Sequence, residues 1–437
     1  MTELPPGAPA PWAAPSAGTV TVYRGATLFD GTGDRARPGT TIVTDGARIH
    51  TVADDGDPLP PLPADAPRVE LDGRYVVPGL IDTHQHLATP PDRPAAEAVL
   101  RRLVHSGVTA VRDMADDLRQ IGDLARATLV GETPGPDIRY AALMAGPSFF
   151  DDPRTHEVCR GAVPGAVPWM QAVTPETDLR IAVALARGTY AAAIKVYADL
   201  DAETVAAVTA EAHRQGIAVW AHAAVFPAAP GEVVAAGVDS VSHVTLLAFE
   251  DPTGPLSSYK AKPPVDHVRF STGDDPRLAA LFAEMRRRGT VLDATASMWT
   301  SDELRGDTAE SAERARLAAE LAAAVTAQAY RAGVAICTGT DFETEPDDPF
   351  PALHGELAFL ADRCGMPAAE VLRSATLVGA RAAGTEADMG SVEAGKLANF
   401  AVLDEDPLQD IAHLRSISLT VKRGRRFTRA DFEKDAQ

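Results

Sequence analysis

The spacing of hydrophobic and polar positions changes twice along this chain, and the changes separate two kinds of structure. Residues 19–75 contain short β-rich runs separated by turn signals such as Asp45-Gly46. From residue 76 onward, apolar runs of strand length alternate with Ala- and Leu-rich helical stretches, a pattern typical of parallel βα units. After Met389 the β-rich runs return. The pattern therefore predicts alternating strands and helices between two β-rich ends.

This arrangement predicts the domain organisation. We expect an α/β fold in which residues 76–387 form a (β/α)8 TIM barrel. Residues 19–75 and 388–430 are expected to combine in space as one small β-sandwich domain built from both chain ends. Residues 1–18 are rich in Pro and Ala and are expected to form a disordered tail. They lack the basic residues and the apolar run of a signal peptide.

Several predicted strands end in side chains that can bind metals. The strands are expected at residues 76–86, 108–113, 192–197, 218–222, 238–243, 291–294 and 334–341. His84 and His86 stand two residues apart, so on a strand both point to the same side and can hold one metal ion. Further strands end in Lys195, His222, His243 and Asp341. A single strand-end histidine is usually a hydrogen-bonded structural residue, but this whole set at the carboxyl ends of barrel strands favours a shared site.

Composition limits the partners of the chain. The net charge is −20, from 41 Lys and Arg against 61 Asp and Glu, which repels phosphate backbones and argues against nucleic-acid binding. No stretch approaches the ~20 apolar residues of a membrane span. The three cysteines have unrelated spacings that suit neither a disulfide framework nor a zinc ribbon, so we expect a reducing, cytoplasmic location. The expected partner is a small-molecule substrate.

Residues 77–86, which end in the pair His84 and His86, resemble the first-strand motif of the amidohydrolase superfamily. The lysine, two histidines and aspartate that follow match the ligand order of that superfamily. Residues 194–197, with a histidine near the end of the next strand, look like the subgroup that has a carboxylated lysine and two metal ions. The imidazolonepropionase-like and prolidase-like branch is resembled by residues 211–217, 221–222 and 242–243, and its return into the sheet domain by residues 390–400. Asn399 stands where that branch usually has Asp, in a segment with a structural role. The resemblance extends from about residue 20 to about residue 425.

The resemblance implies a centre of two divalent metal ions. Its imidazole and carboxylate ligands suit Zn²⁺, and Mn, Co or Ni would also fit. It implies a Lys195 side chain carboxylated by CO2 that lies between the two ions. One ion would be held by His84, His86 and Asp341, and the other by His222 and His243. Asp341 would take a proton from the attacking water and pass it to the leaving group. Relatives commonly assemble, so a homo-oligomer is expected.

The implied reaction is hydrolysis of an amide or peptide C–N bond, in a substrate such as an N-acyl amino acid or an Xaa-Pro-like dipeptide. Deaminases of the same superfamily usually have Glu three residues after the fifth-strand histidine, where this chain has Val225. That difference, together with Lys195, argues against nucleobase deamination. A lactonase or esterase that uses the same centre stays open. A non-catalytic metal-binding relic also stays open, although the complete ligand set argues against it.

Further residues are candidates for contact with substrate. Tyr197 lies two residues after Lys195 and shares its strand face. The other candidates are His156 in a long loop, Met298 and Trp299 after the seventh strand, and His354 after the eighth. Residues 250–275 have the length and composition of a lid over the barrel mouth.

Overall fold

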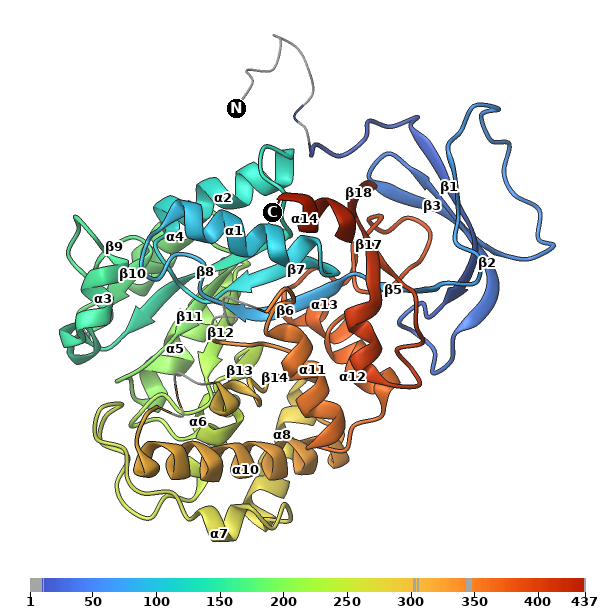
Figure 1. The fold of residues 1–437 in the computed structure, drawn as a ribbon. Coiled ribbons are helices and arrows are strands. Elements are labelled where there is room, and N and C mark those ends of the chain that lie inside the picture. The colour runs from blue at the N-terminus through green and yellow to red at the C-terminus, as the bar shows by residue number, and fades with distance from the viewer. Residues whose placement is uncertain (1–9, 11, 302–303, 305, 343–347, 436–437) are drawn as a thin grey trace.

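The computed structural model describes residues 10, 12–301, 304, 306–342 and 348–435. Figure 1 shows a barrel surrounded by helices and, beside it, a sheet in which blue strands from the start of the chain lie next to red strands from its end. The two parts join where β5 (Tyr75–Pro78) of the sheet leads almost directly into β6 (Leu80–Gln85) of the barrel. The structure therefore confirms the fold class predicted from the sequence.

Eight parallel strands of the described chain form the barrel. They are β6, β7 (Val108–Asp113), β8 (Asp137–Ala145), β11 (Ala193–Val196), β12 (Ala218–His222), β13 (Ser240–Ser242), β14 (Val291–Asp293) and β15 (Ile336–Cys337). Each strand pairs in parallel with the next one in this order. The circle closes where the Thr83 N–H of β6 donates to Thr338 O, just after β15, at 2.8 Å. The carboxyl ends of the strands consequently share one mouth.

One barrel strand, β8, is not among the strands predicted from the sequence. It contains Ala141, Ala142 and Ala145, and alanine favours helices over strands. Every residue of β8 except Arg139 is buried. A strand covered on both faces lacks the alternation of polar and apolar positions by which a half-exposed strand is recognised.

Helices cover the outside of the barrel (Figure 1). They include α1 (Arg93–Val104), α2 (Leu118–Val130), α4 (Leu179–Gly188), α5 (Ala202–Arg214), α6 (Pro230–Ala235), α8 (Pro276–Arg288), α10 (Ala309–Arg331) and α11 (Leu353–Asp362). Before α2, α4, α5 and α8, an aspartate side chain accepts a backbone N–H of the first turn, which satisfies a donor that the helix itself leaves unpaired. Of the described helices, none is long and apolar enough to cross a membrane.

Shorter helices and strands lie in the connections and at the end of the chain. They are α3 (Pro153–Val158), β9 (Ala166–Val167), β10 (Met170–Ala172), α7 (His267–Phe270), α12 (Ala368–Ser374), α13 (Leu377–Ala382) and α14 (Arg429–Asp435). The strand β10 pairs in parallel with the end of β8, and β9 pairs with β10, so both extend the barrel sheet near its mouth.

The second sheet combines both ends of the chain. Its strands follow the order β18-β17-β16-β5-β1-β2-β3, with β4 beside β1. Their bounds are β1 (Val20–Leu28), β2 (Arg37–Asp45), β3 (Arg48–Asp54), β4 (Arg68–Glu70), β16 (Phe400–Leu403), β17 (Ile417–Lys422) and β18 (Arg425–Thr428). Tyr23 and Phe400, from opposite ends of the chain, pack edge to face with ring centroids 5.0 Å apart. The two ends therefore share one hydrophobic core.

Of the predicted disordered tail, residues 1–18, residues 1–9 and 11 lie outside the described residues. Within the described part, the Trp12 N–H donates to Gly131 O at 3.0 Å. A Cβ added at Gly131 would lie 1.9 Å from Ala13 N, so only glycine allows this close approach. Residues 12 and 13 therefore lie against the end of α2.

Candidate metal centre

The structure brings all of the metal-binding candidates to the mouth of the barrel. Within the strands, His84 lies in β6, Lys195 in β11 and His222 at the end of β12. His86 and His243 directly follow β6 and β13, and Asp341 lies in the loop after β15. The backbone φ angles of His243 and Asp341 are 72° and 58°, a left-handed conformation that is uncommon for residues other than glycine and that concentrates at functional sites.

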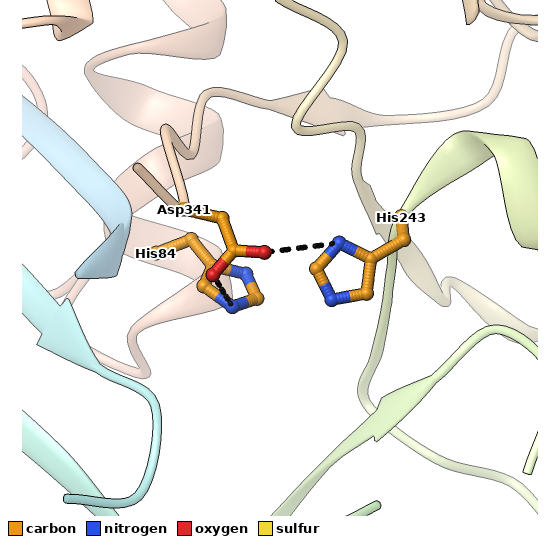
Figure 2. A group of neighbouring side chains, drawn as sticks. All are labelled: His84, His243 and Asp341. Carbon is orange, nitrogen blue, oxygen red and sulfur yellow. Dashed lines mark ion pairs between the residues drawn. The ribbon is translucent and has the colours of Figure 1, made fainter. Parts of the chain in front are cut away.

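Asp341 lies at the centre of one half of the group. Its Oδ1 atom lies 3.3 Å from Nε2 of His84 and also 3.3 Å from Nε2 of His86. Its Oδ2 atom lies 3.6 Å from Nδ1 of His243. Figure 2 shows the Asp341 carboxylate between the rings of His84 and His243. Two imidazole nitrogens therefore converge on a single carboxylate oxygen.

The other ring nitrogens of this histidine pair are held by carboxylates. Nδ1 of His84 lies 2.7 Å from Asp293 Oδ2, and Nδ1 of His86 lies 2.7 Å from Asp116 Oδ1. An ionised carboxylate only accepts hydrogen bonds, so each Nδ1 carries a proton and each Nε2 faces Asp341. Burial would lower the pKa of His86, but Asp116 and Asp341 raise it well above its ordinary value, so a metal ion that binds Nε2 of His86 displaces a proton there. Histidines that bind metals are usually oriented in this way, by a carboxylate that accepts from the distal nitrogen.

His222 and His243 form the other half of the group. Their ring centroids lie 4.7 Å apart. Nδ1 of His222 is buried and has no hydrogen-bond partner among the described residues. Burial and the charge of Lys195 lower the pKa of His222 well below its ordinary value. Burial also lowers the pKa of His243 to about 3, although Asp341 opposes the shift. Both rings are therefore neutral at neutral pH, and the neutral ring is the form that binds metal.

The donor set fits divalent metal ions. Imidazole nitrogen and carboxylate oxygen are the ordinary non-sulfur ligands of zinc. Ligand atoms of His84, His243 and Asp341 all lie within 4.8 Å of one another. Nδ1 of His222 is buried and has no hydrogen-bond partner among the described residues, so this ring has a further nitrogen that no other group occupies. The assignment of the individual residues as ligands remains a prediction.

Lys195 is fully buried, and the pKa of its amine is lowered. Burial lowers the pKa of Lys195 to about 7, although the negative charges of Asp293 and Asp341 act in the opposite direction. A large share of the amine is therefore neutral at neutral pH. Only the neutral amine has a lone pair, so only this form can react with CO2.

Asp293 joins these groups beneath the mouth and was not singled out in the sequence. Its carboxylate is fully buried and accepts from Arg112 Nη2 at 3.1 Å, Ser242 Oγ at 2.9 Å and Thr83 Oγ1 at 3.1 Å. Burial alone would raise the pKa of Asp293, but His84 and Arg112 hold it below its ordinary value. The signal was available, because Asp293 ends β14 just as the other candidates end their strands.

The candidates for substrate contact differ in how near they lie to the histidines of the group. The ring of Tyr197 lies 3.9 Å from that of His222 between centroids. Thr295 Oγ1 contacts both His243 Nδ1, at 2.9 Å, and Met298 Sδ, at 3.5 Å, so Met298 lies one contact away from the centre. Trp299 is half-buried against the main hydrophobic core. Of these three residues, Tyr197 contacts a histidine of the group directly and Met298 is linked to one through Thr295.

His354 is directed away from the mouth, and His156 lies on a short helix after β8. Nε2 of His354 lies 3.1 Å from Ser106 O. Ser106 comes two residues before β7, at the end of that strand opposite the mouth. His354 packs there against Phe350, with ring centroids 5.2 Å apart. His156 is exposed on α3. His354 therefore lies away from the mouth, whereas substrate contact by His156 stays a prediction.

Residues 250–275, predicted to be a lid, bring an aromatic side chain to the centre. The ring of Tyr259 lies 5.7 Å from that of His222 and 5.5 Å from that of Tyr197, between centroids. Its backbone N–H donates to Asp199 Oδ1 at 2.8 Å, which fastens the segment to the loop after β11. Nothing in the local sequence distinguishes Tyr259, because a loop has no periodicity that reports its direction.

The chain matches one protein-family model and is similar to several solved structures. A family model with the description "Amidohydrolase family" matches residues 75–427. No curated protein sequence matches the chain. Among solved structures, a Xaa-Pro dipeptidase with bound methionine is 22% identical, with a TM-score of 0.70, and the match covers 94% of this chain and 100% of that one.

Two further solved structures have the same fold. The ochratoxinase of A. niger is 22% identical with a TM-score of 0.72, and the match covers 95% of this chain and 96% of that one. A putative prolidase from Bifidobacterium longum is 24% identical with a TM-score of 0.70, with coverage of 96% and 98%. At these identities the likeness shows the fold, while activity has to be argued from the site.

Proposed function

The chain belongs to the amidohydrolase family, and on that premise we propose that it is a metal-dependent hydrolase that cleaves an amide or peptide C–N bond of a small molecule. The substrate class we propose is an N-acyl amino acid or an Xaa-Pro-like dipeptide. The observation that carries the proposal is the pair of Nε2 atoms, of His84 and His86, that lie 3.3 Å from the same oxygen of Asp341.

The similar structures support the substrate class by analogy. One is described as a Xaa-Pro dipeptidase and another as a putative prolidase. The first of these names refers to dipeptides of the Xaa-Pro type. The aromatic rings of Tyr197 and Tyr259 beside His222 offer an apolar contact surface for one part of such a substrate.

We assign one divalent metal ion to His84, His86 and Asp341, a second to His222 and His243, and the place between them to a carboxylated Lys195. Ions bound there would polarise the carbonyl of the scissile bond and acidify a water molecule. The chain itself fixes the ligand orientation, because Asp293 and Asp116 hold the imidazole tautomers of His84 and His86 before any ion arrives.

Asp341 is the residue that moves the proton. Burial would raise the pKa of Asp341, but His84 and His243 hold it well below its ordinary value, so the carboxylate is ionised at neutral pH. It can therefore accept the proton of the attacking water on a carboxylate oxygen. The same oxygen then delivers that proton to the leaving nitrogen, which departs as a neutral amine.

The test is a substrate screen with the purified full chain, supplied with Zn²⁺ and bicarbonate. The panel contains N-acyl amino acids, Xaa-Pro dipeptides and lactones, with products followed by mass spectrometry. We expect turnover of amides or dipeptides, and its loss in Asp341→Asn. Asp388→Asn is the control, because Asp388 is a half-exposed partner of Arg48 far from the mouth. Turnover of lactones alone, or of nothing in the panel, would contradict the proposal.

A further inference from the structure

We propose that Ser242, held in place by Asp293, is a positioning residue for the carboxylated side chain of Lys195, and that it acts by accepting the one N–H that this side chain retains. The inference rests on the proposed function, because it concerns the same centre. It adds a residue that lies behind Lys195 and does not belong to the ligand set.

The inference begins with a short chain of buried hydrogen bonds. Lys195 Nζ lies 3.2 Å from Ser242 Oγ, and Ser242 Oγ lies 2.9 Å from Asp293 Oδ2. The side chains of all three residues are inaccessible to solvent. The two hydrogen bonds therefore lie in the barrel interior, away from bulk solvent.

The direction of the serine hydroxyl follows from its partners. Asp293 faces the guanidinium of Arg112 at 3.1 Å and is a carboxylate that can only accept. The single hydroxyl proton of Ser242 is thus used by Asp293. The lone pairs of Ser242 Oγ remain, and they face Lys195. Ser242 consequently acts toward Lys195 as an acceptor and not as a donor.

Carboxylation changes the lysine nitrogen in a way that suits this acceptor. The nitrogen lone pair forms a bond to the carbon of CO2, and one C–O π pair moves onto oxygen. One N–H proton leaves to water, so the product is a planar anion with two oxygens and one N–H. That N–H is a donor and can keep the bond to Ser242 Oγ. The two oxygens then point away from Asp293, whose like charge repels them, and toward the histidines.

The strand register explains why this serine reaches Lys195. Lys195 pairs with Trp220 of β12, and Trp220 pairs with Ser240 of β13. Ser242 lies two residues farther along β13, on the same side as Ser240 and nearer the mouth. Alternate strands of a barrel contribute side chains to the same interior layer, so β11 and β13 can meet without β12 between them.

The same strand provides a matched control. Ser240 is also fully buried, but its Oγ accepts from Arg112 Nη1 at 3.0 Å and, among the described residues, forms no hydrogen bond with Lys195. Ser240→Ala removes one buried hydroxyl from β13, as Ser242→Ala does. A general weakening of β13 would affect both variants, whereas the loss of an acceptor for Lys195 would affect only Ser242→Ala.

The experiment measures carboxylation directly. The full chain is incubated with ¹³C-bicarbonate, and the labelled carbamate is quantified by ¹³C NMR and by the mass added in native mass spectrometry. We expect about fivefold less carbamate in Ser242→Ala, the effect of one buried hydrogen bond. Ser242→Thr keeps the hydroxyl and should restore the label, and Ser240→Ala should match the wild type. Ser242→Cys retains the volume with a weak acceptor and should fall in between, which covers the case in which the alanine variant does not fold.

The outcomes separate this inference from the proposed function. Equal labelling of wild type and Ser242→Ala, or an equal loss of label in Ser240→Ala, would overturn the role of Ser242. Neither result would contradict the proposed hydrolase function. Absence of label in a wild-type chain that still hydrolyses amides would overturn the inference through its premise of carboxylation. Absence of both label and hydrolysis would overturn the proposed function as well.

Discussion

Asp293→Asn is the change that best tests the buried network beneath the site. The Asp293 carboxylate and the Arg112 guanidinium lie 3.1 Å apart, and both side chains are inaccessible to solvent. Removal of one partner from a buried ion pair leaves the other charge uncompensated, at a cost of about 3 to 5 kcal/mol. Arg112 keeps three other acceptors, Thr83 O at 2.7 Å, Ser240 Oγ at 3.0 Å and Ala382 O at 3.1 Å, and it stacks on Trp220. We therefore expect a loss near the lower end of that range.

The measurement is equilibrium unfolding in urea of the metal-free chain, so that metal binding does not contribute to the stability. Asp388→Asn is the matched control, because Asp388 pairs with Arg48 at 2.9 Å with both side chains about half exposed. An exposed pair of this kind contributes at most about 1 kcal/mol. If Asp293→Asn is destabilised no more than Asp388→Asn, the buried network does not stabilise the barrel as we argue.

Further predictions concern proton transfer, substrate contact and acid stability. Asp341→Asn should lower kcat at least ~100-fold in a turnover assay, because the general base is lost; activity within tenfold of the wild type would contradict this role. Tyr197→Leu should raise KM about fivefold with little change in kcat, because one aromatic contact is lost; an unchanged KM would exclude contact with substrate. Burial lowers the pKa of His354 in the folded chain to about 4. As the pH drops below about 6.5, His354 is protonated in the unfolded chain before it is protonated in the folded chain, so the free energy of unfolding falls between about pH 6.5 and about pH 4. His354→Asn should make that fall shallower by up to about 1.4 kcal/mol per pH unit in urea titrations, and an unchanged slope would contradict the buried neutral state.

The positions of the ligand candidates could be predicted because two periodic rules apply to them. Side chains two residues apart share a strand face, which related His84 to His86, and parallel strands present their carboxyl ends at one mouth. The same rules would have identified Asp293, which ends β14. A strand-end aspartate also resembles an ordinary turn residue, so its role becomes clear only when Arg112 and Ser242 are found around it.

The remaining parts of the site depend on three-dimensional contacts that no local pattern records. Tyr259 reaches His222 from a loop of 250–275, where neither strand nor helix spacing fixes a direction. His354 follows the eighth strand in sequence, but the chain turns so that its ring contacts Ser106. The strand β8 was missed because it is alanine-rich and covered on both faces. The sequence therefore places a residue within a strand more securely than a residue that only follows a strand end.

The central claim is a two-metal centre that includes Lys195, and metal content tests it most directly. The full chain is saturated with Zn²⁺ in the presence of bicarbonate, dialysed, and analysed by plasma mass spectrometry, with His213→Ala as control because His213 lies at the surface beside Asp239. The account predicts about two zinc ions per chain for wild type and control, and about one or fewer for Lys195→Ala. Fewer than one ion per wild-type chain, with no change in Lys195→Ala, would contradict it.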